Sequence, residues 1–159
     1  MTILVIGKSG QIARALLERA GEYSDICALG RPELDLTDLP SLDRAIDTLH
    51  PSVLINAAAY TAVDKAESEK RQAFAVNEAG PRALAKLCQV RKIPLIHYST
   101  DYVFDGHKSA PYDEDDPTSP VSAYGRSKLA GEQAIASEMD NFLILRTAWV
   151  YSPFGSNFV

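Results

Sequence analysis

The sequence predicts an α/β protein in which helices cover both faces of a doubly wound parallel sheet. Three observations lead to this prediction. Short apolar runs of strand length alternate with longer stretches whose apolar residues recur at helical spacing. A glycine-containing turn, residues 7–10, joins the first apolar run directly to the first helical stretch. Strands that are separated by helices pair in parallel, because each crossover helix packs on a face of the sheet.

The expected elements follow one another without an internal repeat, a low-complexity tract or a linker between domains. The apolar runs expected as strands are residues 1–6, 25–29, 53–58, 94–99 and 142–147. The stretches expected as helices are one through Ala15, Leu16, Leu17 and Ala20, followed by residues 39–49, 66–90 and 124–137. We expect the third stretch to be interrupted or restarted near Gly80 and Pro81, because proline is tolerated in the first turn of a helix and disrupts its interior.

Length and composition fit one soluble globular domain, residues 1–159, with a sizeable core. Hydrophobic residues make up 46% of the 159 residues, and the formal net charge is -5. Mild acidity and dispersed basic residues argue against a nucleic-acid partner, and no stretch reaches transmembrane length or has the pattern of a signal peptide. Cys27 and Cys88 are interpreted as small buried residues in a reducing compartment. We therefore expect a cytoplasmic protein without a membrane partner.

The turn after the first strand has the chemistry of a dinucleotide site. Gly7 and Gly10 carry no Cβ where the backbone must turn tightly and approach a ligand, and the helix start offers unpaired N–H groups to a pyrophosphate. The spacing is G-x-x-G-x-x-A and differs from G-x-G-x-x-G, and no Gly-Lys-Ser/Thr follows at the distance that a Walker loop requires. A strand before this turn and a helix after it favour a cofactor site, and with it a Rossmann-type fold.

Tyr124 and Lys128 lie four residues apart in an expected helix, so both side chains emerge on the same face. A phenol has a reference pKa of about 10, and a neighbouring cation that favours phenolate brings its proton into a useful range for acid–base catalysis. Taken alone, such a pair is also typical of an ordinary solvated helix face.

Residues 100–123 break the alternation of strands and helices. They are rich in Asp, Pro, Ser and Gly, and long loops of this kind in compact domains are usually functional or disordered. The segment begins at the carboxyl end of an expected strand, the edge where open α/β sheets bind ligands. Its acidic run, residues 113–116, is interpreted as a solvated loop, because it lacks the ligand spacing of a metal site.

Five segments resemble the dTDP-4-dehydrorhamnose reductase family, which belongs to the extended short-chain dehydrogenases/reductases. They are residues 7–11 (GKSGQ), 56–67 (NAAAYTAVDKAE), 99–106 (STDYVFDG), 124–132 (YGRSKLAGE) and 146–151 (RTAWVY). The second and third segments are specific to this family and its nearest relatives, whereas the glycine turn and Tyr-x-x-x-Lys are shared by the superfamily. The resemblance implies NAD(P)H-dependent reduction of the C4 ketone of dTDP-4-dehydro-L-rhamnose, which yields dTDP-L-rhamnose.

The resemblance assigns catalytic roles to three residues. Tyr124 would protonate the alkoxide formed at the sugar ketone, Lys128 would hold the nicotinamide ribose hydroxyls and lower the pKa of the phenol, and Thr100 would hydrogen-bond the carbonyl oxygen. Without the flanking segments, the Thr100 hydroxyl would be interpreted as a cap at the end of a strand.

The resemblance also implies cofactor and substrate contacts. Besides Tyr124 and Lys128, the expected cofactor-binding residues are Gly7, Gly10, Gln11, Ile12, Asp35, Leu36, Ala59, Tyr60, Thr61 and Tyr98. Asp101 and Trp149 would contact the substrate together with Thr100. A buried core tryptophan explains Trp149 equally well.

The preference between cofactors depends on the end of the second strand. NAD-selective domains usually carry an acidic residue there for the ribose 2′-hydroxyl, while an arginine nearby accommodates the 2′-phosphate of NADPH. This chain has Gly30 and Arg31, which slightly favours NADPH over NADH. A solvent-facing Arg31 is the alternative, and Asp35 lies close enough in the sequence to leave NADH open.

The sequence departs from the family in two places. Members that bridge a dimer through magnesium have a glutamate on the first helix where this chain has Ala15, so we expect no bound metal and no dimer of that kind. A homo-oligomer through other surfaces stays open. The chain stops at Val159, where relatives continue into a carboxyl-terminal portion that closes over the nucleotide sugar. We therefore interpret the chain as the cofactor-binding part of a larger enzyme.

Three alternative functions remain at this point. Another sugar-nucleotide epimerase or dehydratase would share the glycine turn and the Tyr-Lys pair. A non-catalytic module similar to the regulatory subunit of methionine adenosyltransferase would keep the fold and serve a partner enzyme. A serine hydrolase using Ser9 and His97 is disfavoured, because the G-x-S-x-G elbow is missing and His97 falls inside an expected strand, where a core histidine is the simpler interpretation.

Overall fold

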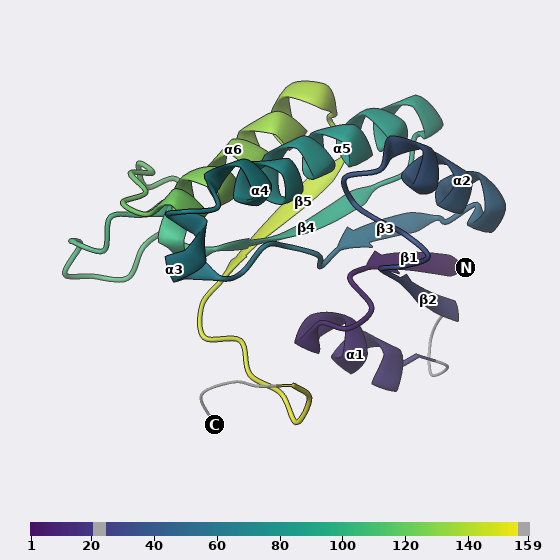
Figure 1. Cartoon of the computed structure of the whole chain (residues 1–159), viewed down its shortest axis with the longest axis horizontal. Helices are drawn as coiled ribbons and strands as arrows, with labels where there is room; N and C mark the ends of the chain where they lie inside the picture. The colour runs from purple at the N-terminus through teal and green to yellow at the C-terminus, as the bar shows by residue number, and fades with distance from the viewer. Residues whose placement is uncertain (21–24, 156–159) are drawn as a thin grey trace.

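The computed structural model describes residues 1–20 and 25–155; Val159, where the chain ends, lies outside these ranges. Its strands form one parallel sheet in the order β2-β1-β3-β4-β5 (Figure 1). The strands are β1 (Thr2–Ile6), β2 (Asp25–Leu29), β3 (Val53–Asn56), β4 (Leu95–Thr100) and β5 (Phe142–Thr147). From β1 the chain first adds β2 on one side and then β3 on the other, so the strand order reverses between β1 and β3. Ligands of doubly wound sheets bind at the carboxyl ends of the strands beside such a reversal.

Helices cover the two faces of this sheet, as the sequence predicted. Figure 1 shows α1 (Gln11–Glu18) against one face, and α2, α4, α5 and α6 on the other side. The helices and helical turns after α1 are α2 (Leu39–Leu49), α3 (Val63–Ala66), α4 (Lys70–Phe74), the π-helical turn η1 (Ala75–Ala79), α5 (Gly80–Arg91), the 3₁₀ turn η2 (Asp101–Val103) and α6 (Ala123–Glu138).

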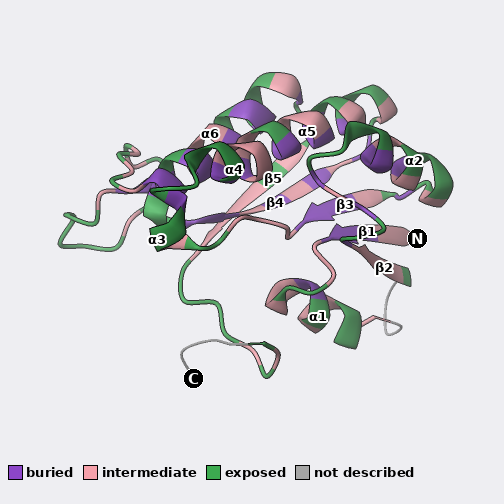
Figure 2. Ribbon diagram, in the orientation of Figure 1, coloured by how far each residue is buried: buried purple, intermediate pink, exposed green. Residues whose placement is uncertain are grey.

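The alternation of side chains along the strands builds a separate apolar core on each face. Leu4 and Leu54 point to the side of α2, α5 and α6, where they join the larger core. Val5 and Ile55 point to the other side and pack with Ala13 of α1. Figure 2 shows how the buried positions concentrate in the central strands and on the inner faces of the helices. Central parallel strands are apolar on both faces for this reason.

An α-helix restarts near Gly80 and Pro81, as expected, because α5 begins at Gly80 and has Pro81 in its first turn. The restart leaves no gap, since the helical backbone is continuous from Lys70 to Arg91, and an additional break lies earlier, between Ala66 and Lys70. Immediately before the proline the helix widens into η1, where the Gly80 N–H donates to the carbonyl of Ala75 five residues back. The wider turn shifts the hydrogen-bond register by one residue just ahead of Pro81, which has no N–H to donate.

Candidate cofactor and catalytic site

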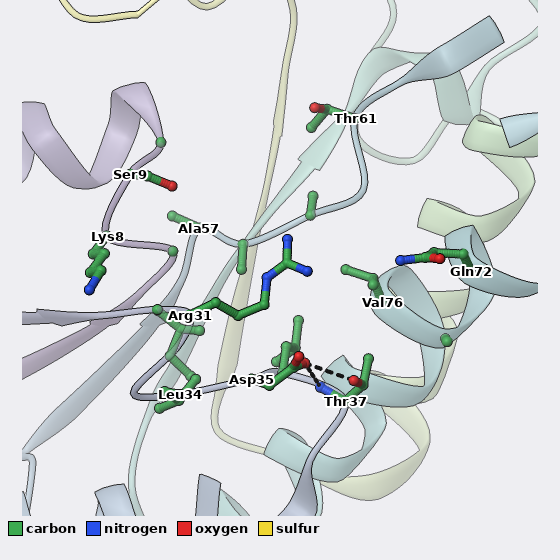
Figure 3. Close-up of a pocket in the computed structure, with 18 of the residues that line it drawn as sticks. Lys8, Ser9, Arg31, Leu34, Asp35, Thr37, Ala57, Thr61, Gln72 and Val76 are labelled. Carbon is green, nitrogen blue, oxygen red and sulfur yellow. Dashed lines mark hydrogen bonds between the residues drawn. The ribbon is translucent and has the colours of Figure 1, made fainter. Parts of the chain in front are cut away.

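A cavity of about 1020 Å³ opens at the carboxyl ends of β1, β2 and β3, beside the reversal of strand order (Figure 3). Its walls come from the turn after β1, the segment after β2, the segment after β3, and α4 with η1. The expected cofactor residues that line it are Gly7, Gly10, Arg31, Asp35, Leu36, Ala59 and Thr61. The place and size of the cavity suit a dinucleotide.

The turn after β1 needs glycine at its first position. Gly7 has φ +109°, and a Cβ there would lie 2.9 Å from the backbone nitrogen of Ala58. Gly10 closes the turn by donating its N–H to the Gly7 carbonyl at 2.9 Å, and then precedes α1. Gln11 and Ile12 form the first turn of α1 and are not among the residues that line the cavity. The backbone can therefore approach a ligand closely at this point.

The segment after β2 brings one cation and one carboxylate to the cavity. Figure 3 shows the side chain of Arg31 extending into the open space. The Oδ1 atom of Asp35 accepts hydrogen bonds from the Thr37 N–H at 2.8 Å and from the Thr37 hydroxyl at 2.7 Å, and these bonds lower the pKa of the Asp35 carboxyl. Asp35 is thus held ionised and turned toward Thr37, while Arg31 faces the cavity.

Two buried asparagines hold the segment after β3 in place. Asn56 at the end of β3 accepts the Ala58 N–H at 3.1 Å. Asn77 in η1 accepts the Tyr60 N–H at 2.8 Å and donates to the Tyr60 carbonyl at 3.0 Å. Its amide also donates to the hydroxyl of Ser127 at 2.9 Å, which ties this segment to α6.

Sequence reasoning missed both the Asn77 clamp and the wall that α4 and η1 add to the cavity. The residues of that region that line the cavity are Ser68, Glu69, Arg71, Gln72, Ala75 and Val76. Asn77 had one available signal, because asparagine is unfavourable in a helix interior and yet falls within an expected helical stretch. The wall residues carried none, since their pattern resembles that of any amphipathic helix.

Helix α6 turns its Tyr124–Lys128 face inward. Tyr124 is 9% exposed and Lys128 is 1% exposed, so the alternative of an ordinary solvated helix face is wrong. The start of α6 is fixed by the Ser122 hydroxyl, which accepts the Gly125 N–H at 3.0 Å. A Cβ at Gly125 would lie 2.2 Å from the Tyr102 carbonyl oxygen, so glycine allows α6 to sit directly on η2. This close contact brings Tyr124 to the end of β4.

The prediction that Lys128 lowers the pKa of Tyr124 was wrong. The pKa of Tyr124 is raised, first because burial disfavours the phenolate, and a hydrogen bond with the Thr100 side chain only partly offsets this. The Lys128 ammonium is directed elsewhere, since it donates to the Tyr98 carbonyl at 2.7 Å. A raised pKa keeps the Tyr124 phenol protonated at neutral pH, which is the form that can donate a proton.

Thr100 closes β4 and contacts three neighbouring residues. Its hydroxyl donates to Asp101 Oδ1 at 3.1 Å and accepts the Tyr102 N–H at 3.2 Å, so it caps η2 as well as facing Tyr124. Asp101 is exposed beside it. Trp149 lies beyond the end of β5 and is 75% exposed, so the alternative of a buried core tryptophan is wrong.

Residues 1–20 and 25–155 contain no group of three or more His, Cys, Asp or Glu side chains placed to hold a metal. Within the acidic run after η2, Asp113 and Asp116 form ion pairs with Lys108. Across the same described ranges, no helix combines the length and apolarity that crossing a membrane requires.

The family model described as RmlD substrate binding domain matches residues 1–159. The dTDP-4-dehydrorhamnose reductase of Sinorhizobium fredii is 53% identical over 159 residues, which is 100% of this chain and 54% of that protein. The reductase of the same name from Burkholderia thailandensis is 45% identical over 100% of this chain and 53% of its own length.

Among solved structures, the dTDP-4-dehydrorhamnose reductase of Bacillus anthracis in complex with NADP matches with a TM-score of 0.95 and 35% identity. The match covers 99% of this chain and 56% of that one. The chain thus spans about half the length of the curated relatives it matches. Because the family model covers the whole sequence, the chain belongs to the RmlD substrate binding domain family.

Proposed function

We propose that this chain is the single NAD(P)-binding Rossmann-like domain, residues 1–159, of a cytoplasmic enzyme that reduces dTDP-4-dehydro-L-rhamnose to dTDP-L-rhamnose. Substrate-binding residues of a carboxyl-terminal portion would complete the site. The observation that carries the proposal is the burial of Tyr124 and Lys128 beside Thr100, at the sheet edge that also holds the dinucleotide-sized cavity. The names of the relatives support the choice of substrate.

The residues at the end of β4 and the start of α6 suit a ketone reduction. A reduced nicotinamide, when bound, supplies the hydride that reaches the carbonyl carbon. The Thr100 hydroxyl hydrogen-bonds the carbonyl oxygen as negative charge develops there, and Tyr124 transfers its phenolic proton to that oxygen. Lys128 holds the ribose hydroxyls from the position that its hydrogen bond to the Tyr98 carbonyl gives it.

The remaining expected residues complete the proposed site. Gln11 and Ile12 present backbone N–H groups to the pyrophosphate at the start of α1. Tyr60 and Tyr98 contribute through their backbone, and the Tyr98 carbonyl already orients Lys128. Arg31 binds the 2′-phosphate and makes NADPH the slightly preferred cofactor over NADH.

The proposed substrate contacts lie on the exposed side of this region. Asp101 hydrogen-bonds the sugar, and the exposed indole of Trp149 offers a flat apolar face to the sugar or the base. The partner is therefore a dTDP-sugar, and any homo-oligomer forms through surfaces other than a magnesium-bridged α1.

The decisive experiment compares full-length wild-type protein with Tyr124→Phe, in steady-state assays with dTDP-4-dehydro-L-rhamnose and NADPH. Loss of a positioned proton donor should reduce kcat about 10²- to 10⁴-fold, while NADPH binding and thermal stability stay close to wild type. Tyr102→Phe is the matched control, because it removes the same oxygen from a neighbouring, 47% exposed tyrosine whose ring contacts Tyr124.

Three results would contradict the proposal. A Tyr124→Phe enzyme that works within a few-fold of wild type would remove the assigned proton donor. Turnover that retains NAD(H) through the cycle, in place of stoichiometric NADPH consumption, would favour an epimerase or dehydratase. Cofactor binding without any turnover, together with co-purification of a synthetase, would favour the regulatory module.

A further inference from the structure

Three buried polar side chains from different elements form a row behind the proposed catalytic site. Asn56 of β3 lies with its Nδ2 3.0 Å from Nδ1 of His97 on β4, and the other ring nitrogen, Nε2, lies 3.4 Å from Nζ of Lys128 on α6. Asn56 and His97 are fully buried, and Lys128 is 1% exposed. The proposed mechanism uses Lys128 but assigns nothing to the other two residues.

The backbone fixes the orientation of the Asn56 amide. The N–H of Ala58 is a donor, so the Asn56 atom 3.1 Å from it is the carbonyl oxygen. The NH₂ group of Asn56 therefore faces His97 Nδ1 and requires that nitrogen to be an acceptor. A neutral imidazole carries one hydrogen, which must then sit on Nε2.

This tautomer points an N–H at the amine of Lys128. An ammonium group has only donors, so the charged form of Lys128 places donor against donor across the 3.4 Å contact. The neutral amine has a lone pair that accepts the His97 Nε2–H. The carbonyl of Tyr98, 2.7 Å from Nζ, accepts a hydrogen from either form and so does not discriminate between them.

The charged groups around Lys128 do not reverse the preference for its neutral amine. Glu132, one turn further along α6, is paired with Arg146 of β5 at 2.7 Å and bonded to Ser99 of β4, so its charge is largely balanced. Burial accordingly lowers the pKa of Lys128 to about 8, with Glu132 opposing it only in part.

None of the other groups that face Lys128 or its neighbours favours the ammonium form of Lys128. Burial and then the Lys128 charge hold the pKa of His97 well below its ordinary value, so the ring stays neutral. Asn77 and Ser127 of the adjoining elements are uncharged, and Asp101 of η2 acts on Tyr124.

We propose that Asn56 and His97 are positioning residues that form a tautomer lock. In this lock, Asn56 keeps the hydrogen of His97 on Nε2, and the Nε2–H favours the neutral amine of Lys128 over the ammonium. The lock keeps Lys128 aligned on the Tyr98 carbonyl in both its charged and its neutral form. This proposal rests on the proposed function for its catalytic consequence, but the tautomer itself is independent of turnover.

The test uses full-length protein labelled with ¹⁵N-histidine, in which long-range ¹⁵N–¹H spectra identify the tautomer of each ring. Wild-type His97 should carry its hydrogen on Nε2 and should not titrate between about pH 5.5 and 9. Asn56→Asp keeps the shape and the bond to Ala58, but its carboxylate accepts from His97 Nδ1, so the hydrogen should move to Nδ1. Asn56→Ser removes the NH₂ donor without adding charge and should give a mixture of tautomers.

Activity supplies the second measurement. In both Asn56 variants the basic limb of the pH profile of kcat/KM should move upward, by at least one pH unit in Asn56→Asp, because His97 Nε2 becomes an acceptor for the ammonium. A wild-type His97 that carries its hydrogen on Nδ1, or that titrates near neutrality, would overturn the proposal. Variants that lose stability while the pH profile stays in place would show a merely structural role and would overturn it too.

The two proposals fail in different ways. Full-length protein without ketone reduction but with the Nε2–H tautomer would refute the proposed function and leave the lock standing. Normal reduction with the other tautomer would refute the lock alone.

Discussion

Replacing Lys128 by methionine should remove a stability cost that the wild-type protein carries at neutral pH. Methionine has nearly the same length and no charge, so it fills the space between α6 and β4. Burial lowers the pKa of Lys128 from 10.5 to about 8 in the folded protein. Between these two values the unfolded chain binds more protons than the folded one, so the free energy of unfolding rises with pH over this range.

The magnitude follows from the two pKa values. For a folded pKa of about 8 and an unfolded pKa of about 10.5, the contribution of Lys128 to the free energy of unfolding increases by roughly 2 to 3 kcal/mol between about pH 7 and pH 10. Lys128→Met should lose this increment. Its stability at pH 7 should stay within about 2 kcal/mol of wild type, because removing a buried charge offsets the Tyr98 carbonyl that is left without its donor.

The assay is urea unfolding of full-length wild type and Lys128→Met at pH 7 and pH 10, with the same pair measured for Lys86→Met. Lys86 on α5 is exposed, with 59% of its side chain accessible, so that variant should show no such pH-dependent difference. Turnover and cofactor affinity should both fall in Lys128→Met, because the proposed contact of Lys128 with the nicotinamide ribose is lost. The reasoning would be refuted if the free energies of unfolding of wild type and Lys128→Met differed by the same amount at both pH values, within about 0.5 kcal/mol.

Three further predictions concern the cofactor, the assembly and the packing of α6. Arg31→Ala should weaken NADPH binding about tenfold or more in calorimetric titrations and change NADH binding little, because one charge-assisted contact to the 2′-phosphate is lost; equal losses for both cofactors would contradict this role. Adding magnesium or EDTA should leave the sedimentation coefficient unchanged, and a magnesium-dependent dimer would reveal ligands not recognised here. Gly131→Ala should destabilise the protein by about 1 to 3 kcal/mol and weaken cofactor binding, because its Cβ would lie 2.1 Å from the Asn77 carbonyl oxygen. Gly80→Ala should also lower the melting temperature in a parallel thermal melt, since its Cβ would lie 2.5 Å from Cγ of the buried Leu36 and 3.1 Å from the Leu36 carbonyl oxygen.

Local patterns in the sequence were enough to predict the elements of the fold. Apolar runs and helical spacing placed residues 25–29, 39–49 and 142–147 at the bounds that the structure has. The strand-turn-helix pattern around Gly7 also predicted which edge of the sheet would bind a ligand. The helical restart at Gly80 and Pro81 was predicted as well, but the widened turn η1 before it was not, because the rule for proline considers only the missing N–H.

The chemistry of the site was decided by tertiary structure. The four-residue spacing predicted that Tyr124 and Lys128 share a helix face, but only the packing of α6 against β4 decided that this face is buried. Burial raises the pKa of Tyr124 and lowers that of Lys128, in each case against the charged form. The partners that complete the environment of Lys128, among them His97, lie about thirty positions away in the sequence and become neighbours only when the sheet assembles. A pKa depends on solvent access and on contacts across the fold, and no short sequence pattern encodes either.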